Sequence, residues 1–183
     1  MGGINGAYVH ILINHFPIIL SLLGAAAAVL ALVRPRRTLW VYAVATLTLA
    51  GLSAYPTVLA GHQAEDSIEK MPYASRRAIH AHEEAGELAM WVLLATGVIA
   101  AYAWFRTSQS APRDETFAAP GWLRALVAAG AVASAGTASY AAKLSDPIMH
   151  YSPTLPHPAA PGIPAVAPTV PAVATPPVLP PAP

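Results

Sequence analysis

Four apolar stretches, each long enough to cross a lipid bilayer, dominate this sequence. A membrane-spanning helix needs about 20 consecutive, mostly apolar residues. Such runs occur at about residues 11–33, 39–60, 87–105 and 122–142. The chain is 55% hydrophobic and only 10% charged, whereas an ordinary globular domain is roughly a quarter charged. The sequence therefore predicts an all-α fold, an integral membrane four-helix bundle, with the lipid bilayer as its first partner.

The composition changes sharply near the C-terminus, and this divides the chain into two parts. Residues 1–151 hold the four apolar stretches and form the predicted transmembrane domain. Residues 152–183 contain twelve of the nineteen prolines and no Asp, Glu, Lys or Arg. Proline at this density prevents a helix and favours polyproline II. We predict a disordered Pro-rich tail, and a docking peptide for a partner protein is the alternative.

Two further features of the composition exclude classes of function. The chain has no cysteine, which rules out disulfides, thiolate metal sites, Fe–S clusters and covalently attached c-type haem. Lysines and arginines do not form the dense basic patch that a nucleic-acid-binding protein needs. We therefore expect no nucleic-acid partner.

The distribution of arginine predicts the orientation of the bundle. The first and third connections between the apolar stretches carry Arg34, Arg36, Arg37, Arg106, Arg113 and Arg124. The middle connection also holds three cations, but five acidic residues accompany them. By the positive-inside rule the first and third connections are cytoplasmic. Both termini and residues 61–86 are then extracytoplasmic, and an aromatic belt is expected at the cytoplasmic boundary, formed by Trp40, Trp104 and Trp122.

Histidines gather at one end of the predicted bundle. The seven are His10, His15, His62, His80, His82, His150 and His157. In the predicted topology all of them fall on the extracytoplasmic side. Neutral imidazole is the commonest protein ligand for iron, copper and zinc, and carboxylates join it at harder sites. This one-sided set predicts a haem b or a transition metal ion.

Helix geometry limits which of the first two histidines can face the interior. His10 and His15 are about 140° apart at 100° per residue, so only one of them can point to the bundle axis. His15 lies deeper in its apolar run, where an ionisable side chain is costly and usually functional. We predict that His15 faces inward. Pro17 and Pro56 are expected to interrupt their helices in the same third of the membrane.

The ligands that accompany His15 are expected around the middle connection. His80, Glu83, Glu84 and Glu87 share one helical stripe, and His82 points away from it if the helix has already begun there. Further candidate metal ligands close the second apolar stretch: Glu65, and His62, for which a solvated loop histidine is the simpler interpretation.

Three motifs give the sequence a resemblance to a known family. They are His10-Ile11-Leu12-Ile13-Asn14-His15-Phe16-Pro17-Ile18, Gly61-His62-Gln63-Ala64-Glu65 and Ile79-His80-Ala81-His82-Glu83-Glu84. In this order they resemble the bacterial four-helix membrane proteins of the DUF2231 class over about residues 8–105. The resemblance implies the bacterial inner (cytoplasmic) membrane and, loosely, a redox or metal-linked role. Carried over residue by residue, it picks out His15, Glu65, His82 and Glu83, and so favours His82 over His80.

These observations predict a membrane subunit that binds haem b or a transition metal through His15 and His82, or His15 and His80. Such a subunit would support electron transfer in a larger respiratory or photosynthetic complex, or in a homo-oligomer. The alternative is a structural subunit that docks through its Pro-rich tail. An enzyme acting on its own is disfavoured, because no H-E-x-x-H or comparable signature occurs. A transporter is disfavoured as well, because four helices without an inverted repeat form a small scaffold for one.

Overall fold

The structure, a computed structural model, describes residues 6–69, 75–110 and 119–149, all of which belong to the first of two units, Met1–Tyr151 and Ser152–Pro183. The predictions for His150, His157 and the Pro-rich tail lie outside the described residues. Within them the only regular secondary structure is helical, which confirms the all-α prediction. The helices are α1 (Gly6–Ile13), α2 (His15–Val33), α3 (Arg37–Ile68), α4 (Arg76–Ser110), α5 (Gly121–Leu144) and α6 (Asp146–Met149).

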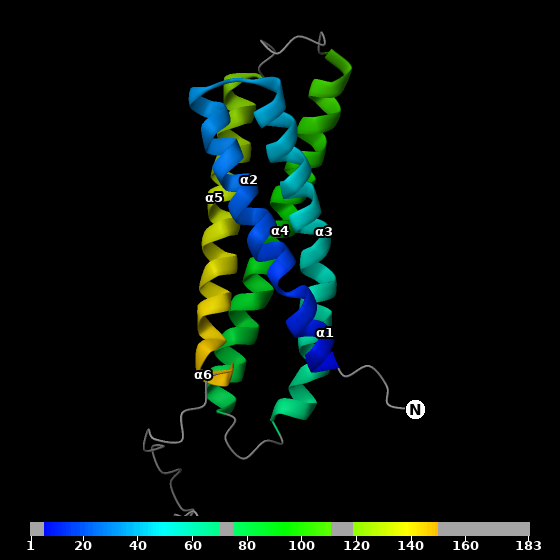
Figure 1. The fold of residues 1–183 in the computed structure, drawn as a ribbon, viewed down its shortest axis with the longest axis vertical. Coiled ribbons are helices and arrows are strands. Elements are labelled where there is room, and N and C mark those ends of the chain that lie inside the picture. Colours follow the sequence, from blue (N-terminus) through cyan, green and yellow to red (C-terminus); the bar gives the residue numbers. More distant parts are fainter. Residues whose placement is uncertain (1–5, 70–74, 111–118, 150–183) are drawn as a thin grey trace, which may run out of the picture. The chain divides into compact units, whose positions relative to one another are not determined.

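The four long helices form an antiparallel bundle in which consecutive helices run in opposite directions (Figure 1). α3 packs between α2 and α4, and α5 packs against both α4 and α2, so the four helices close a ring. α1 continues the line of α2 and lies against α3. Four helical segments are long and apolar enough to cross a membrane: Gly6–Val33, Arg37–Glu65, Arg76–Ser108 and Gly121–Ile148.

Two of the helices extend well beyond the apolar runs that predicted them. α3 continues to Ile68 and not to about 60, and α4 begins at Arg76 and not near 87. The added turns are polar but rich in good helix formers such as alanine, glutamate and arginine. An apolar run therefore marks the part of a helix that is compatible with lipid, while polar residues of high helix propensity can extend the helix beyond that run.

The two prolines expected to interrupt helices behave differently. α1 and α2 are separated at Asn14, three residues before Pro17. Since proline has no backbone N–H, it cannot bond the carbonyl four residues earlier, and the helix is weakened at this point. Pro56, by contrast, lies inside α3, which remains a single helix through it.

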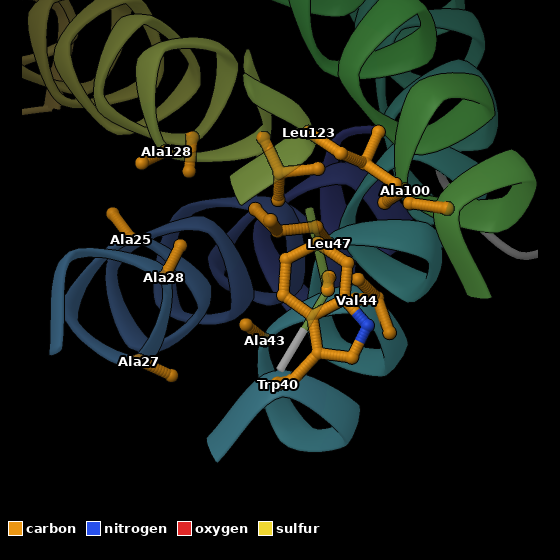
Figure 2. Close-up of a cluster of buried hydrophobic side chains, with 14 of the residues drawn as sticks. Ala25, Ala27, Ala28, Trp40, Ala43, Val44, Leu47, Ala100, Leu123 and Ala128 are labelled. Carbon is orange, nitrogen blue, oxygen red and sulfur yellow. The ribbon is translucent and has the colours of Figure 1, made fainter. Parts of the chain in front are cut away.

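The interior of the bundle is made of small side chains and its outer surface of large apolar ones. Most of the buried hydrophobic residues are alanines, and one cluster of them surrounds Trp40, Val44 and Leu47 (Figure 2). On the outside, Leu52 is 66% exposed and Val98 is 69% exposed. Membrane helices associate through small residues that let their backbones approach, and they present large apolar side chains to lipid.

Closest approach between α3 and α4 occurs at a pair of glycines. A Cβ atom added at Gly51 would lie 2.8 Å from the Leu93 carbonyl oxygen, and one at Gly97 would lie 3.1 Å from the Gly51 Cα.

Near the opposite end of the bundle from the histidines, the Trp40 indole Nε1 donates a hydrogen bond of 3.0 Å to Thr107 Oγ1. Trp40 is 3% exposed, so at this end of the bundle its ring packs inside and its N–H finds a partner there, whereas Trp104 and Trp122 are exposed.

Adding a methyl group at the α3–α4 contact should destabilise the bundle. We expect Gly51→Ala to lower the free energy of unfolding in detergent by about 1–3 kcal/mol, because the new methyl group meets backbone that cannot rotate away. Gly136→Ala is the matched control, since no atom lies within 4 Å of its added Cβ. Denaturation titrations followed by circular dichroism measure both; equal stability of the two variants would contradict the contact.

Candidate metal centre

All five histidines in the described part of the chain lie toward one end of the bundle. This is the end where α1 begins, α3 ends and α4 begins (Figure 1). His10 and His15 come from α1 and α2, His62 comes from α3, and His80 and His82 come from α4. The predicted clustering of these five is therefore confirmed. They divide into an inner pair, an outer group and one residue that stands apart.

The inner pair is His10 and His82, both half-buried. Their ring centroids are 6.2 Å apart and the ring planes are nearly perpendicular, at 86°. His10 packs over Gly61, where an added Cβ would lie 3.2 Å from the imidazole. Gly61 thus provides the space that lets the ring lie between α1 and α3.

Each ring of the inner pair is bonded to a backbone carbonyl of a neighbouring helix. His10 Nδ1 lies 2.9 Å from the Thr57 oxygen, and His82 Nδ1 lies 2.8 Å from the Ala141 oxygen. A carbonyl oxygen only accepts, so Nδ1 donates in both cases, and a neutral ring then carries its lone pair at Nε2. The two bonds tie α1 to α3 and α4 to α5.

His82 also caps a helix. Ala141 lies in the last turn of α5, which ends at Leu144, and last-turn carbonyls have no partner within their own helix. Arg124 plays the same part near the other end of the bundle: its Nη1 donates to the Ala31 oxygen of α2 at 2.9 Å. The half-buried position of His82 therefore has a sufficient structural explanation.

The outer group joins the end of α3 to the start of α4. His62 Nε2 lies 3.4 Å from Glu83 Oε1 and 3.4 Å from Glu87 Oε1. His80 Nδ1 lies 3.5 Å from Glu83 Oε2. Ligand atoms lie within 4.8 Å of one another in two sets, His62 with Glu83 and Glu87, and Glu65 with His80 and Glu83.

These separations suit a bound cation. Two ligands on a tetrahedral ion with bonds of about 2.1 Å lie about 3.4 Å apart. That is the spacing from His62 Nε2 to both of its glutamate oxygens. As simple ion pairs the same contacts would contribute little, about 0–1 kcal/mol each, because the His62 side chain is 43% exposed and that of Glu87 is 51% exposed.

His15 is not part of either set. Its side chain is exposed, and its Nδ1 is 3.3 Å from the Ile11 oxygen one turn earlier. The prediction that His15 faces the interior is therefore wrong, and His10 takes that position. His10 packs over Gly61, where the missing side chain leaves space for its ring.

The other predicted residues are divided between the two layers. Glu65, Glu83 and His62 come together in the outer group, with His80 beside them. His82 joins the inner pair instead. The helical stripe that favoured His80 applies, because α4 already begins at Arg76. His82, which the resemblance favoured, also points inward, but it contacts the His10 ring and the Ala141 carbonyl and does not join the outer group.

His10 was not predicted as a member of the site, and Glu87 was recognised only as part of the helical stripe that begins at His80. A signal for the outer group does exist in the sequence: His-x-x-Glu occurs at His62–Glu65 and again at His80–Glu83, with Glu87 one further turn along. Residues three and four apart share a helix face, so each motif presents its ligands together. The sequence alone does not indicate whether His10 or His15 faces inward, because this depends on which of them lies opposite Gly61 in the folded bundle.

Comparison with protein-family models, with curated proteins and with solved structures finds no match to this chain. The resemblance to the DUF2231 class stays a prediction based on its three motifs.

Removing the His10 imidazole should loosen α1. We expect His10→Ala to lose a hydrogen bond worth about 1 kcal/mol, together with packing over Gly61, and so to increase amide hydrogen exchange in residues 6–13. His15→Ala should change exchange in these residues less, because its ring is exposed and its Nδ1 contact with the Ile11 oxygen, at 3.3 Å, does not tie α1 to α3. Mass-spectrometric exchange on the purified protein compares the two; a larger effect at His15 would reverse the assignment.

Proposed function

We propose that this protein is a multi-pass membrane protein that binds a divalent transition metal ion at the polar ends of α3 and α4. The observation that carries the proposal is the convergence of His62 with Glu83 and Glu87, whose ligand atoms lie within 4.8 Å of one another. These residues come from two helices, and the two distances from His62 Nε2, 3.4 Å each, match the spacing of two ligands on a tetrahedral ion.

Support for the membrane setting comes from the distribution of side-chain size. Four helices are long and apolar enough to cross a bilayer, their interior is rich in alanine, and large apolar residues cover the outside. α4 has 35 residues, so at 1.5 Å per residue it is about 50 Å long, whereas the hydrocarbon core is about 30 Å thick. The polar ends that carry the metal ligands would then stand at the bilayer surface, in contact with water.

The ligand types select a class of metal. One imidazole nitrogen with two carboxylate oxygens suits zinc, iron(II) or manganese(II), while copper(I) prefers sulfur ligands. The inner pair supports the outer group from below, because Gly61 and His62 are adjacent in sequence and so are His82 and Glu83. A fixed inner layer holds the ends of α3 and α4 at the spacing that the outer ligands need.

A haem b between His10 and His82 is the second candidate. Its favouring observation is the 6.2 Å between ring centroids, which leaves room for two metal–nitrogen bonds of about 2 Å each. The outer group is the stronger candidate, because it supplies three ligand atoms to one position. A haem or a redox-active ion such as iron would suit an electron-transfer subunit, whereas zinc has no redox chemistry and would not. A larger complex or a homo-oligomer would supply the redox partner.

Metal binding should depend on the outer group and not on the neighbouring acidic residue. We expect the detergent-purified chain to bind Co²⁺ with visible d–d absorption. His62→Ala and Glu83→Ala should weaken binding about 100-fold, since even the residues that only support metal ligands cost 10–100-fold when mutated. Glu84→Ala is the matched control, because Glu84 is exposed and belongs to neither ligand set.

The same samples separate the two cofactors. A purified wild-type protein with neither retained metal nor Co²⁺ binding would overturn the metal proposal. A Soret band that disappears in His82→Ala but persists in His62→Ala would assign the cofactor to the inner pair instead.

Because the sequence contains no cysteine, a single introduced cysteine is the only thiol that a maleimide can label, and the proposed orientation can be measured in this way. We propose that the metal-binding end is extracytoplasmic, because arginines crowd the opposite connections. Ser75→Cys, at the start of α4, should react with a membrane-impermeant maleimide on intact cells. Pro35→Cys, between α2 and α3, should react only after the membrane is opened. The reverse labelling pattern would invert the topology.

A further inference from the structure

The two oxygens of the Glu83 carboxylate face different histidines. Oε1 lies 3.4 Å from His62 Nε2, and Oε2 lies 3.5 Å from His80 Nδ1. A carboxylate in this position, with one oxygen toward each of two nitrogen ligands, is arranged to bridge two cations.

Glu83 is also the only residue that the two ligand sets within the described chain have in common. One set adds His62 and Glu87, and the other adds His80 and Glu65. Each set therefore has one imidazole and one carboxylate of its own, together with one oxygen of the shared carboxylate. The two half-sites are chemically equivalent, which a chance gathering of surface charges would not require.

Helix geometry explains why the two half-sites are alike. His-x-x-Glu occurs once at the end of α3 and once at the start of α4, and residues three apart share a helix face. The antiparallel packing of α3 against α4 turns the two motifs toward each other. Helix bundles build carboxylate-bridged two-metal centres from the same components, glutamates and histidines spaced one turn apart on facing helices.

The charge of the group is compatible with two ions. Three carboxylates meet in the group, from Glu65, Glu83 and Glu87. One divalent cation would leave a net negative charge there when the imidazoles are neutral, whereas two divalent cations would overcompensate it by one, a charge that a bound hydroxide or another anion could balance. The partial exposure of the side chains leaves room for such ligands, since Glu87 is 51% exposed and His80 is 58% exposed.

We propose that the ends of α3 and α4 form a two-metal centre bridged by Glu83. One ion is held by His62 and Glu87, and the other by His80 and Glu65. The ligand set suits zinc, iron(II) or manganese(II), at the separation of about 3.5–4 Å that two-metal sites have. The inference rests on the proposed function, which requires only that one ion bind.

Counting bound ions separates the inference from the proposal on which it rests. The full chain in detergent is loaded with Co²⁺, freed of excess metal by gel filtration and analysed for metal per chain. We expect two ions in the wild type, and one each in His62→Ala and His80→Ala, because each variant removes one half-site. Glu84→Ala should retain two. X-ray absorption of the loaded wild type should show a cobalt–cobalt shell at about 3.5–4 Å.

Glu83→Gln tests the bridge itself. The amide has nearly the same shape as the carboxylate, so the variant keeps its packing while losing the bridging charge; we expect the cobalt–cobalt shell to disappear and the metal content to fall at least to one ion per chain. One ion in the wild type, or two ions without a cobalt–cobalt shell, would overturn the two-metal centre and leave metal binding in place. No bound ion at all would overturn both.

Discussion

Contact between Gly51 and Gly97 sets the register on which the rest of the bundle depends. Because neither residue has a side chain, the α3 and α4 backbones meet directly at this point. A close backbone contact of this kind limits how far the two helices can slide or rotate against each other. Trp40 then meets Thr107 toward one end, and His62 meets Glu87 toward the other. The position of the candidate metal site is in this sense linked to two glycines that lie ten or more residues away.

α5 is held to α4 by a different kind of contact. Ser134 Oγ donates to Thr96 Oγ1 at 3.0 Å, and Thr96 Oγ1 donates to the Gly130 oxygen at 3.2 Å. In lipid, helices gain little from hydrophobic burial, so small residues and hydrogen bonds between helices must hold them together. Alanine dominates the interior for the same reason. A bundle with so small an interior offers little space for a large cofactor, and its ionisable groups gather where the helices leave the apolar region.

The fold could be predicted from the sequence to a considerable extent, and the site only in part. Twenty-residue apolar runs identified the four long helices because lipid allows few alternatives to a helix. Helix ends were missed at Ile68 and Arg76, since hydropathy reports the solvent and not the secondary structure. Glu65, Glu83 and His62 were identified from type and position. His10 was missed in favour of His15 because the choice depends on the rotation of α1 against α3, which is decided by the space over Gly61.

The division between an inner and an outer layer has an energetic reason. His10 and His82 each donate to a carbonyl of another helix, so their contribution to holding α1, α3, α4 and α5 together is present without any ligand. The outer glutamates instead repel one another when no cation is bound, and exposure to solvent and the contacts with His62 and His80 weaken that repulsion. A cation that binds the folded protein and not the unfolded chain adds its binding free energy to stability. The outer layer is therefore the part of the bundle whose stability a bound cation would change, while the inner layer would hold the candidate ligands in position without one.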